Sequence, residues 1–161
     1  MTTQSGTPIR RGLVALLAMA VLIVAFSVPA ASSSGAIVTS GELHAFSAGS
    51  GMDINGRAQM VRTADGKTIV SVHLSGLAPE TTYASHVHAA PCTVGDADGH
   101  FRFDPLGAAA PPNEIWPGPF TTTPAGIGNG FTIAEGTAGP TAVSVVVHAP
   151  GGLKIACADL S

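Results

Sequence analysis

After an apolar N-terminal segment, apolar and polar positions alternate over short stretches of the chain. The clearest stretch is 68–77, in which Val70, Val72 and Leu74 would point to one side and the residues between them to the other. Successive side chains of a strand point to opposite faces, so this period of two predicts a strand with one buried face. Turn residues separate the stretches, and the Asp-Gly pair within 64–67 predicts a hairpin.

The same pattern predicts about eight antiparallel strands, and no segment after the first thirty residues has a convincing helical period. The predicted strands cover residues 36–46, 56–63, 68–77, 82–88, 120–123, 130–134, 141–148 and 154–160. The segment 89–119 has no sustained period and is rich in Ala, Pro, Gly and Asp. An irregular stretch of this length inside a small domain is usually functional or disordered.

Composition supports a loop-rich all-β domain, because the chain has 20 glycines and 12 prolines and only 11% charged residues. Without residues 1–30, five basic residues remain against ten acidic ones, a net charge of −5. Nucleic-acid binding needs a basic face, so we expect no nucleic-acid partner. The length fits one domain, which we place at residues 36–161 after a flexible stretch over 31–35.

Residues 1–30 have the pattern of a secretory signal peptide. Arg10 and Arg11 precede an apolar run over 13–28, and Val28-Pro29-Ala30 provides small residues before a cut after Ala30. The alternative is a retained membrane anchor, but the run is shorter than the ~20 residues that span a bilayer. We therefore expect a protein secreted or held in the cell envelope, exported by the general secretory or the twin-arginine route. Membrane association is expected only if the segment is not cleaved.

The two cysteines, Cys92 and Cys157, both follow the signal segment. An exported protein meets an oxidising compartment, so one Cys92–Cys157 disulfide is the natural interpretation. Two free thiols are the alternative.

Six histidines are candidates for chemistry, and His86 and His88 are the most informative because their rings share one face of a strand. His148 ends a valine-rich run and lies on the face opposite Val143, Val145 and Val147, so we do not expect it in the core. Imidazole ligands suit zinc, copper and nickel, so the ligand type leaves the metal open. The remaining strand histidines, His44 and His73, are interpreted as ordinary polar residues.

In combination, these motifs resemble the Cu/Zn superoxide dismutase family over 36–161. The resemblance is carried by Val72-His73-Leu74-Ser75-Gly76-Leu77, His86-Val87-His88, Cys92, Gly99-His100-Phe101, Asp104-Pro105, Val145-Val146-Val147-His148 and Lys154-Ile155-Ala156-Cys157. It implies a Greek-key β-barrel or sandwich with one copper ion. The copper ligands that it implies are His86, His88, His100 and His148. It also implies the Cys92–Cys157 disulfide.

Departures from the family pattern point to its copper-only branch. No histidine lies between His100 and His148, so two zinc ligands of the family are missing and we expect no zinc. Only eight residues separate His148 from Cys157, so the family's long electrostatic loop is also missing. In copper-only relatives a glutamate contacts the histidine that would otherwise bridge to zinc, and Glu114 is the candidate for orienting His100. Asp96, Asp98 and Asp104 compete for this role.

The implied activity is copper-dependent dismutation of superoxide, with His100 and Lys154 as catalytic residues. Lys154 stands where the family has an arginine; it keeps the positive charge but lacks the planar guanidinium, so activity is expected to be reduced. The first alternative is a copper-binding protein of the cell envelope that is not an enzyme. The second is a structural or adhesive domain on the same scaffold. We expect a monomer that receives copper from a donor protein.

Overall fold

The computed structural model describes residues 1–2 and 35–161. The predicted signal peptide, its cleavage site and most of the expected flexible start of the mature chain lie outside the described residues. In the described part, the strands are β1 (Ile37–Glu42), β2 (His44–Ala45), β3 (Asn55–Arg62), β4 (Thr68–Ser75), β5 (Thr82–His88), β6 (Phe120–Thr121), β7 (Gly128–Ala134), β8 (Ser144–His148) and β9 (Lys154–Asp159). A short 3-10 helix, η1, covers Ser47–Gly49.

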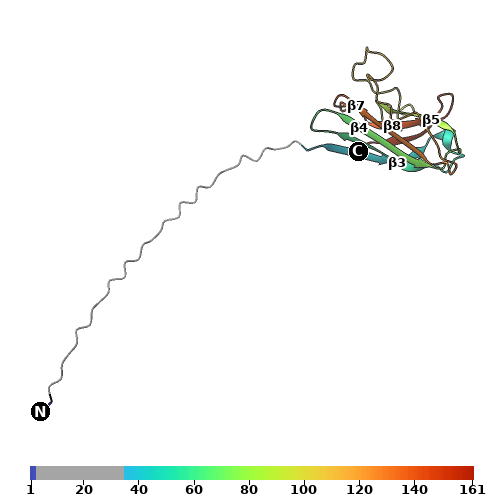
Figure 1. The fold of residues 1–161 in the computed structure, drawn as a ribbon. Coiled ribbons are helices and arrows are strands. Elements are labelled where there is room, and N and C mark those ends of the chain that lie inside the picture. Colours follow the sequence, from blue (N-terminus) through green and yellow to red (C-terminus); the bar gives the residue numbers. More distant parts are fainter. Residues whose placement is uncertain (3–34) are drawn as a thin grey trace. The chain divides into compact units, whose positions relative to one another are not determined.

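The strands form two antiparallel sheets that face each other, which confirms the predicted all-β Greek-key architecture (Figure 1). One sheet has the order β1-β3-β4-β7 and the other has the order β2-β9-β8-β5-β6. Strands distant in sequence, such as β5 and β8, are therefore neighbours. Among the described residues, no helix is long and apolar enough to cross a membrane.

The core lies between the sheets and is filled by the faces that the alternation predicted. Val70, Val72 and Leu74 of β4 are at most 2% exposed, whereas His73 on the opposite face is exposed. Val145 and Val147 of β8 join the same core. Apolar area removed from water is the main favourable term in folding, so these alternating faces fix the register of each strand.

The first predicted strand differs from the structure, because residues 36–46 form two strands in different sheets. β1 pairs with β3, and β2 pairs with β9. Leu43 stands between them, is 4% exposed and donates its amide to the carbonyl of Gly56 at 2.8 Å. The chain thus crosses from one sheet to the other at a buried leucine, and the described residues form nine strands where about eight were predicted. Sequence periodicity alone does not show which sheet a strand joins.

Two other strands begin two or three residues away from their predicted starts. β8 begins at Ser144 rather than at 141, because the amide of Ala142 bonds to the carbonyl of Gly139 in a turn. β7 begins at Gly128, two residues before the predicted start. The hairpin over 64–67 is confirmed, with Gly66 at φ 88°, a conformation that glycine adopts readily.

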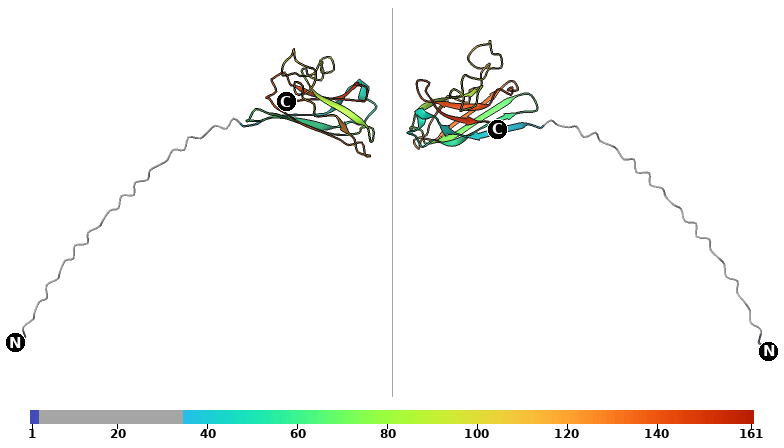
Figure 2. Two further views of the ribbon diagram at one scale, coloured as in Figure 1. Left: turned by 45° about the horizontal axis from the view of Figure 1, so that its top comes forward. Right: turned by 180° about the vertical axis from the view of Figure 1, so that it is seen from behind.

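The long segment between β5 and β6 projects from the sheets, as both views of the ribbon show (Figure 2). The predicted disulfide is confirmed: Cys92 of this segment is bonded to Cys157 of β9. The Asp159 carboxylate also accepts a hydrogen bond from the amide of Cys92 at 2.8 Å. The irregular segment is therefore fastened to the sheet that carries His86, His88 and His148.

Candidate metal centre

Four histidine side chains from three parts of the fold converge in one cluster. His86 and His88 lie two positions apart on β5, so their rings leave the same face of the sheet. The neighbouring strand β8 supplies His148. His100 belongs to the long segment and is held beside β5 by an isolated bridge to His88. One ligand atom from each of the four lies within 4.8 Å of the others.

Hydrogen bonds to backbone carbonyls fix the orientation of two of these rings. The Nδ1 atom of His88 bonds to the carbonyls of Ala97 and Asp98, at 3.1 and 3.2 Å. The Nδ1 atom of His148 bonds to the carbonyl of Gly152 at 3.0 Å. Because a carbonyl only accepts, these Nδ1 atoms carry the hydrogen, and each Nε2 keeps a lone pair.

The remaining nitrogens of the cluster fit a metal ion. Within the described part of the chain, the buried atoms His86 Nδ1, His88 Nε2 and His148 Nε2 have no hydrogen-bond partner. Buried polar atoms without a partner are costly, and a metal ion would satisfy all of them at once. A set of four imidazole side chains is the donor chemistry of copper, zinc or nickel.

The pKa values favour the neutral rings that metal binding requires. Burial, followed by the charge of His100, lowers the pKa of both His86 and His88 to about 3. Burial also lowers the pKa of His148. A histidine binds metal through its unprotonated nitrogen, so these rings are ready to bind near neutral pH without losing a proton first.

The cluster opens to the surface through a groove of about 400 Å³. Its walls include His86, His100 and His148, together with residues of the turn Pro150–Gly152. His88 does not line the groove and is fully buried. A small molecule can therefore approach three of the four rings from one side.

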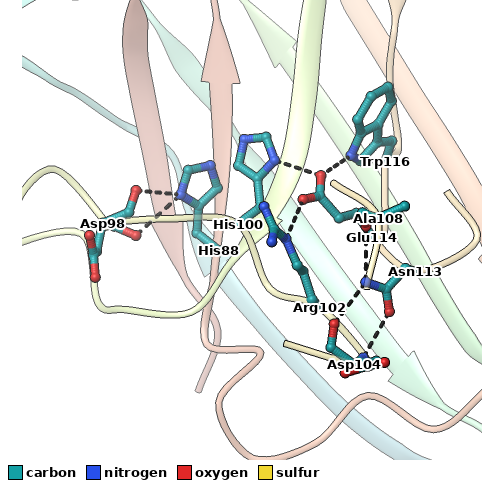
Figure 3. A network of polar contacts seen from close by, with 10 residues as sticks. His88, Asp98, His100, Arg102, Asp104, Ala108, Asn113, Glu114 and Trp116 are labelled. Carbon is teal, nitrogen blue, oxygen red and sulfur yellow. Dashed lines mark hydrogen bonds and ion pairs between the residues drawn. The ribbon is translucent and has the colours of Figure 1, made fainter. Parts of the chain in front are cut away.

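Glu114 lies beside His100 and is the acidic side chain that contacts it (Figure 3). Its Oε2 atom accepts hydrogen bonds from His100 Nδ1 at 2.7 Å and from Trp116 Nε1 at 2.8 Å, and its Oε1 atom accepts one from Arg102 Nε at 3.0 Å. Burial alone would raise the pKa of the Glu114 carboxyl, but these hydrogen bonds together lower it. The group is therefore a carboxylate at neutral pH.

The three aspartates that competed with Glu114 make other contacts. Asp98 contacts His88 through its backbone carbonyl, and the Asp96 carbonyl accepts from Lys154. The side chain of Asp104 accepts from the amide of Leu106 at 2.9 Å.

Lys154 lies on β9, opposite His148 in the sheet. Its Nζ atom donates to the carbonyls of Asp96 and Asp98, at 2.8 and 2.6 Å, and it is absent from the described residues that line the groove. Its charge adds to the effect of burial in lowering the pKa of His88 and of His148. Lys154 thus acts on the cluster electrostatically and through the segment that it binds.

The structure adds two residues that the sequence analysis did not single out, Arg102 and Trp116. Trp116 follows Glu114 by two positions, and its indole N–H donates to the Glu114 carboxylate. The spacing of two between Glu114 and Trp116 was the sequence signal that could have identified Trp116. It becomes informative only once Glu114 is known to contact His100. His44 and His73 lie outside the cluster, and His73 Nδ1 contacts Asn129 Oδ1 at 2.6 Å on the surface of β4.

Comparison with known proteins gives matches among solved structures alone. No family model matches the chain, and no curated protein matches it. Two single-substitution variants of superoxide dismutase 5 from Candida albicans each match with 19% identity. The first gives a TM-score of 0.54 over 79% of this chain and 92% of that chain, and the second gives 0.55 over 77% and 90%. The Cu(II) form of the same protein matches with 20% identity and a TM-score of 0.50, over 76% and 90%.

At this level of identity the likeness establishes the fold. The shared architecture and the four-histidine cluster agree with the resemblance that the sequence motifs carry. The chain therefore has the Greek-key β-barrel fold of a superoxide dismutase.

Proposed function

We propose that the protein is an exported copper-dependent superoxide dismutase with one copper ion and no zinc. One observation carries the proposal: four imidazoles converge within 4.8 Å, and the nitrogens without a partner are those that face the cluster. The solved structures compared above, which share this fold, are of a superoxide dismutase, and one of them is a Cu(II) form. Bound copper supplies one-electron chemistry that converts two superoxide anions and two protons into dioxygen and hydrogen peroxide.

His86, His88, His100 and His148 would hold the copper ion. The hydrogen bonds from Nδ1 of His88 and His148 to carbonyls keep these two rings in place whatever the charge of the ion. In a zinc-containing relative, the ring nitrogen on the far side of His100 would face zinc. Here that nitrogen, Nδ1, contacts Glu114 at 2.7 Å, which supports a site without zinc.

Superoxide would reach the cluster through the groove. Its lining residues include no acidic side chain in the described part of the chain, and Lys154 supplies a positive charge nearby. A local cation raises the encounter rate of an anion with a protein that is acidic overall. His100 lines this groove and its side chain is 28% exposed, so its ring lies where the substrate would enter.

The test is to load the purified domain with copper and measure superoxide removal. We expect activity in the native protein and its loss in His148→Ala, while His73→Ala, which removes an exposed histidine outside the cluster, stays fully active. Metal analysis of protein from its native compartment should give about one copper and no zinc. Equal activity of the native protein and His148→Ala would contradict the proposal.

A second candidate is a copper-binding protein of the cell envelope without fast turnover. The observation that favours it is the position of Lys154, whose Nζ atom is committed to two carbonyls. Lys154→Arg separates the candidates. A large rise in rate would indicate a tuned enzyme, whereas copper binding without activity in both forms would establish binding alone.

The location and assembly of the protein belong to the same proposal. The disulfide suits an oxidising compartment, and the N-terminal thirty residues have the pattern of a signal peptide. We infer a secreted or envelope protein that acts as a monomer and receives copper from a donor protein. Mass spectrometry of the exported chain tests the cut after Ala30, and light scattering tests the monomer.

A further inference from the structure

We propose that Arg102 and Trp116 are positioning residues that hold the Glu114 carboxylate in one orientation and thereby fix the tautomer of His100. His100 then keeps its hydrogen on Nδ1 and presents Nε2 to the metal. The inference rests on the proposed copper site, since it assigns what prepares one ligand of that site. It assigns no contact with the substrate to either residue.

Both oxygens of Glu114 are occupied by donors. Arg102 Nε donates to Oε1 at 3.0 Å, while Trp116 Nε1 and His100 Nδ1 share Oε2 at 2.8 and 2.7 Å (Figure 3). The Glu114 side chain is 1% exposed, so its oxygens are bonded to these three side chains rather than to bulk water. A rotation of the carboxylate would break at least one of these bonds, and the two outer donors therefore determine where the oxygen facing His100 lies.

The backbone around the carboxylate supports the same arrangement. Arg102 and Glu114 form an isolated antiparallel bridge, and the amide of Phe103 bonds to the carbonyl of Asn113 at 2.9 Å. The segment that carries His100 and the segment that carries Glu114 are thus joined as a short ladder. This ladder sets the distance between the two side chains, and Arg102 and Trp116 set the angle of the carboxylate.

Trp116 also contacts a second ligand of the cluster. Its ring lies 4.9 Å from that of His86, centroid to centroid, at an interplanar angle of 53°. One indole therefore touches His86 with its ring and Glu114 with its N–H group. The substitution Trp116→Phe separates these roles, because phenylalanine keeps an aromatic ring beside His86 and removes the donor.

The chemical consequence concerns His100. Neutral imidazole carries its hydrogen on either nitrogen, and the hydrogen bond made by one nitrogen decides which nitrogen is left to bind a metal. A fixed Glu114 selects the hydrogen on Nδ1. If the carboxylate turned away, both tautomers would be populated and part of the protein would offer a protonated Nε2 to the metal. Loss of such an outer partner typically costs 10- to 100-fold in metal affinity.

The test uses nitrogen-15 NMR of the metal-free protein at alkaline pH, which reports the tautomer of each histidine directly. We expect a single Nδ1–H tautomer for His100 in the native protein and a mixture in the double variant Arg102→Gln/Trp116→Phe. Arg57→Gln is the matched control, because it removes an arginine–glutamate ion pair (Arg57–Glu42) that lies on the surface. An unchanged His100 tautomer in the double variant would overturn the inference.

Copper affinity, measured by competition with a chelator, gives the second readout. We expect a 10- to 100-fold weaker affinity in the double variant, partial recovery with Arg102→Lys, and no change in the control. If Arg102→Gln does not fold, Trp116→Phe alone carries the test, with a smaller shift in the same direction. If the native protein has a fixed His100 tautomer but does not bind copper, the proposed function is contradicted and this inference is not. If the native protein binds copper and is active but the double variant keeps the native tautomer, this inference is contradicted and the proposed function is not.

Discussion

Removal of the Cys92–Cys157 disulfide is expected to destabilise the domain by about 4 kcal/mol. The bond joins the irregular segment after β5 to β9, across a sequence separation of 65 residues. In the chain-entropy model, a cross-link stabilises a protein because it restricts the unfolded chain, and the gain rises with the logarithm of the loop length. A loop of this length gives about 4 kcal/mol at 25 °C, which is a large part of the ~5–15 kcal/mol that a domain typically has.

Loss of the disulfide should also weaken copper binding at the four-histidine cluster. Cys92 fastens the segment whose carbonyls at Ala97 and Asp98 orient the ring of His88. Those carbonyls belong to four consecutive residues with positive φ, at 54°, 52°, 65° and 49°. For the three that are not glycine, this left-handed conformation is intrinsically unfavourable. Without the disulfide, the segment can relax to a commoner conformation, and copper affinity should fall together with stability.

The assay is urea unfolding of the metal-free protein, followed by the fluorescence of the single tryptophan. Three samples separate the causes: the native protein, the same protein reduced, and Cys92→Ala/Cys157→Ala. Reduction keeps the side-chain volumes, so it isolates the effect of the cross-link. We expect both altered samples to lose about 4 kcal/mol, to melt roughly 15 °C lower, and to show a larger m-value, since the unfolded chain expands without the bond.

A loss below about 1 kcal/mol in the reduced protein would refute the reasoning. It would mean one of two things. Either the unfolded chain is already compact without the disulfide, or the disulfide destabilises the native state by as much free energy as it gains from restricting the unfolded chain. A large loss in the alanine variant alone would instead point to packing around Cys157, which is 1% exposed.

Three further outcomes are expected. Copper(II) should quench the fluorescence of Trp116, whose ring lies 4.9 Å from His86, with an end point near one equivalent; an equal quench in His148→Ala would contradict binding at the cluster. Met60→Ala should cost about 2–5 kcal/mol, because Met60 is fully buried, whereas Ile37→Ala, at an exposed site, should change stability by less than about 0.5 kcal/mol. The metal-free protein should lose stability as pH falls from 6.5 towards 3, because the pKa values of His86 and His88 are lowered and the unfolded chain takes up protons first. The slope is at most about 1.4 kcal/mol per pH unit for each histidine, and unchanged urea midpoints across this range would contradict it.

Local sequence determined most of the strands and their faces. Alternation along β4 predicted that Val70, Val72 and Leu74 are buried and that His73 is exposed, because a strand places successive residues on opposite sides. The same rule placed His86 and His88 on one face. The order of motifs along the chain supplied the fold and the pairing of the cysteines through their resemblance to a known family.

Contacts between distant segments decided what the sequence left open. Residues 36–46 are divided between two sheets because β1 pairs with β3 and β2 pairs with β9. The hydrophobic period of residues 36–46 does not show which partner strand each half will have. The choice of Glu114 over Asp96, Asp98 and Asp104 depends on the ladder that brings the long segment back beside His100.

Lys154 shows most clearly which properties the sequence predicted and which the tertiary structure decided. Its position in the chain predicted a cation near the cluster, and the structure places it opposite His148. The sequence could not show that Nζ binds the carbonyls of Asp96 and Asp98, because the two residues have positive φ in a segment far from Lys154 along the chain. The resemblance of the sequence motifs to a known family thus predicted which four histidines the cluster contains. The tertiary structure decided which way each group faces, since orientation depends on hydrogen bonds that distant parts of the chain supply.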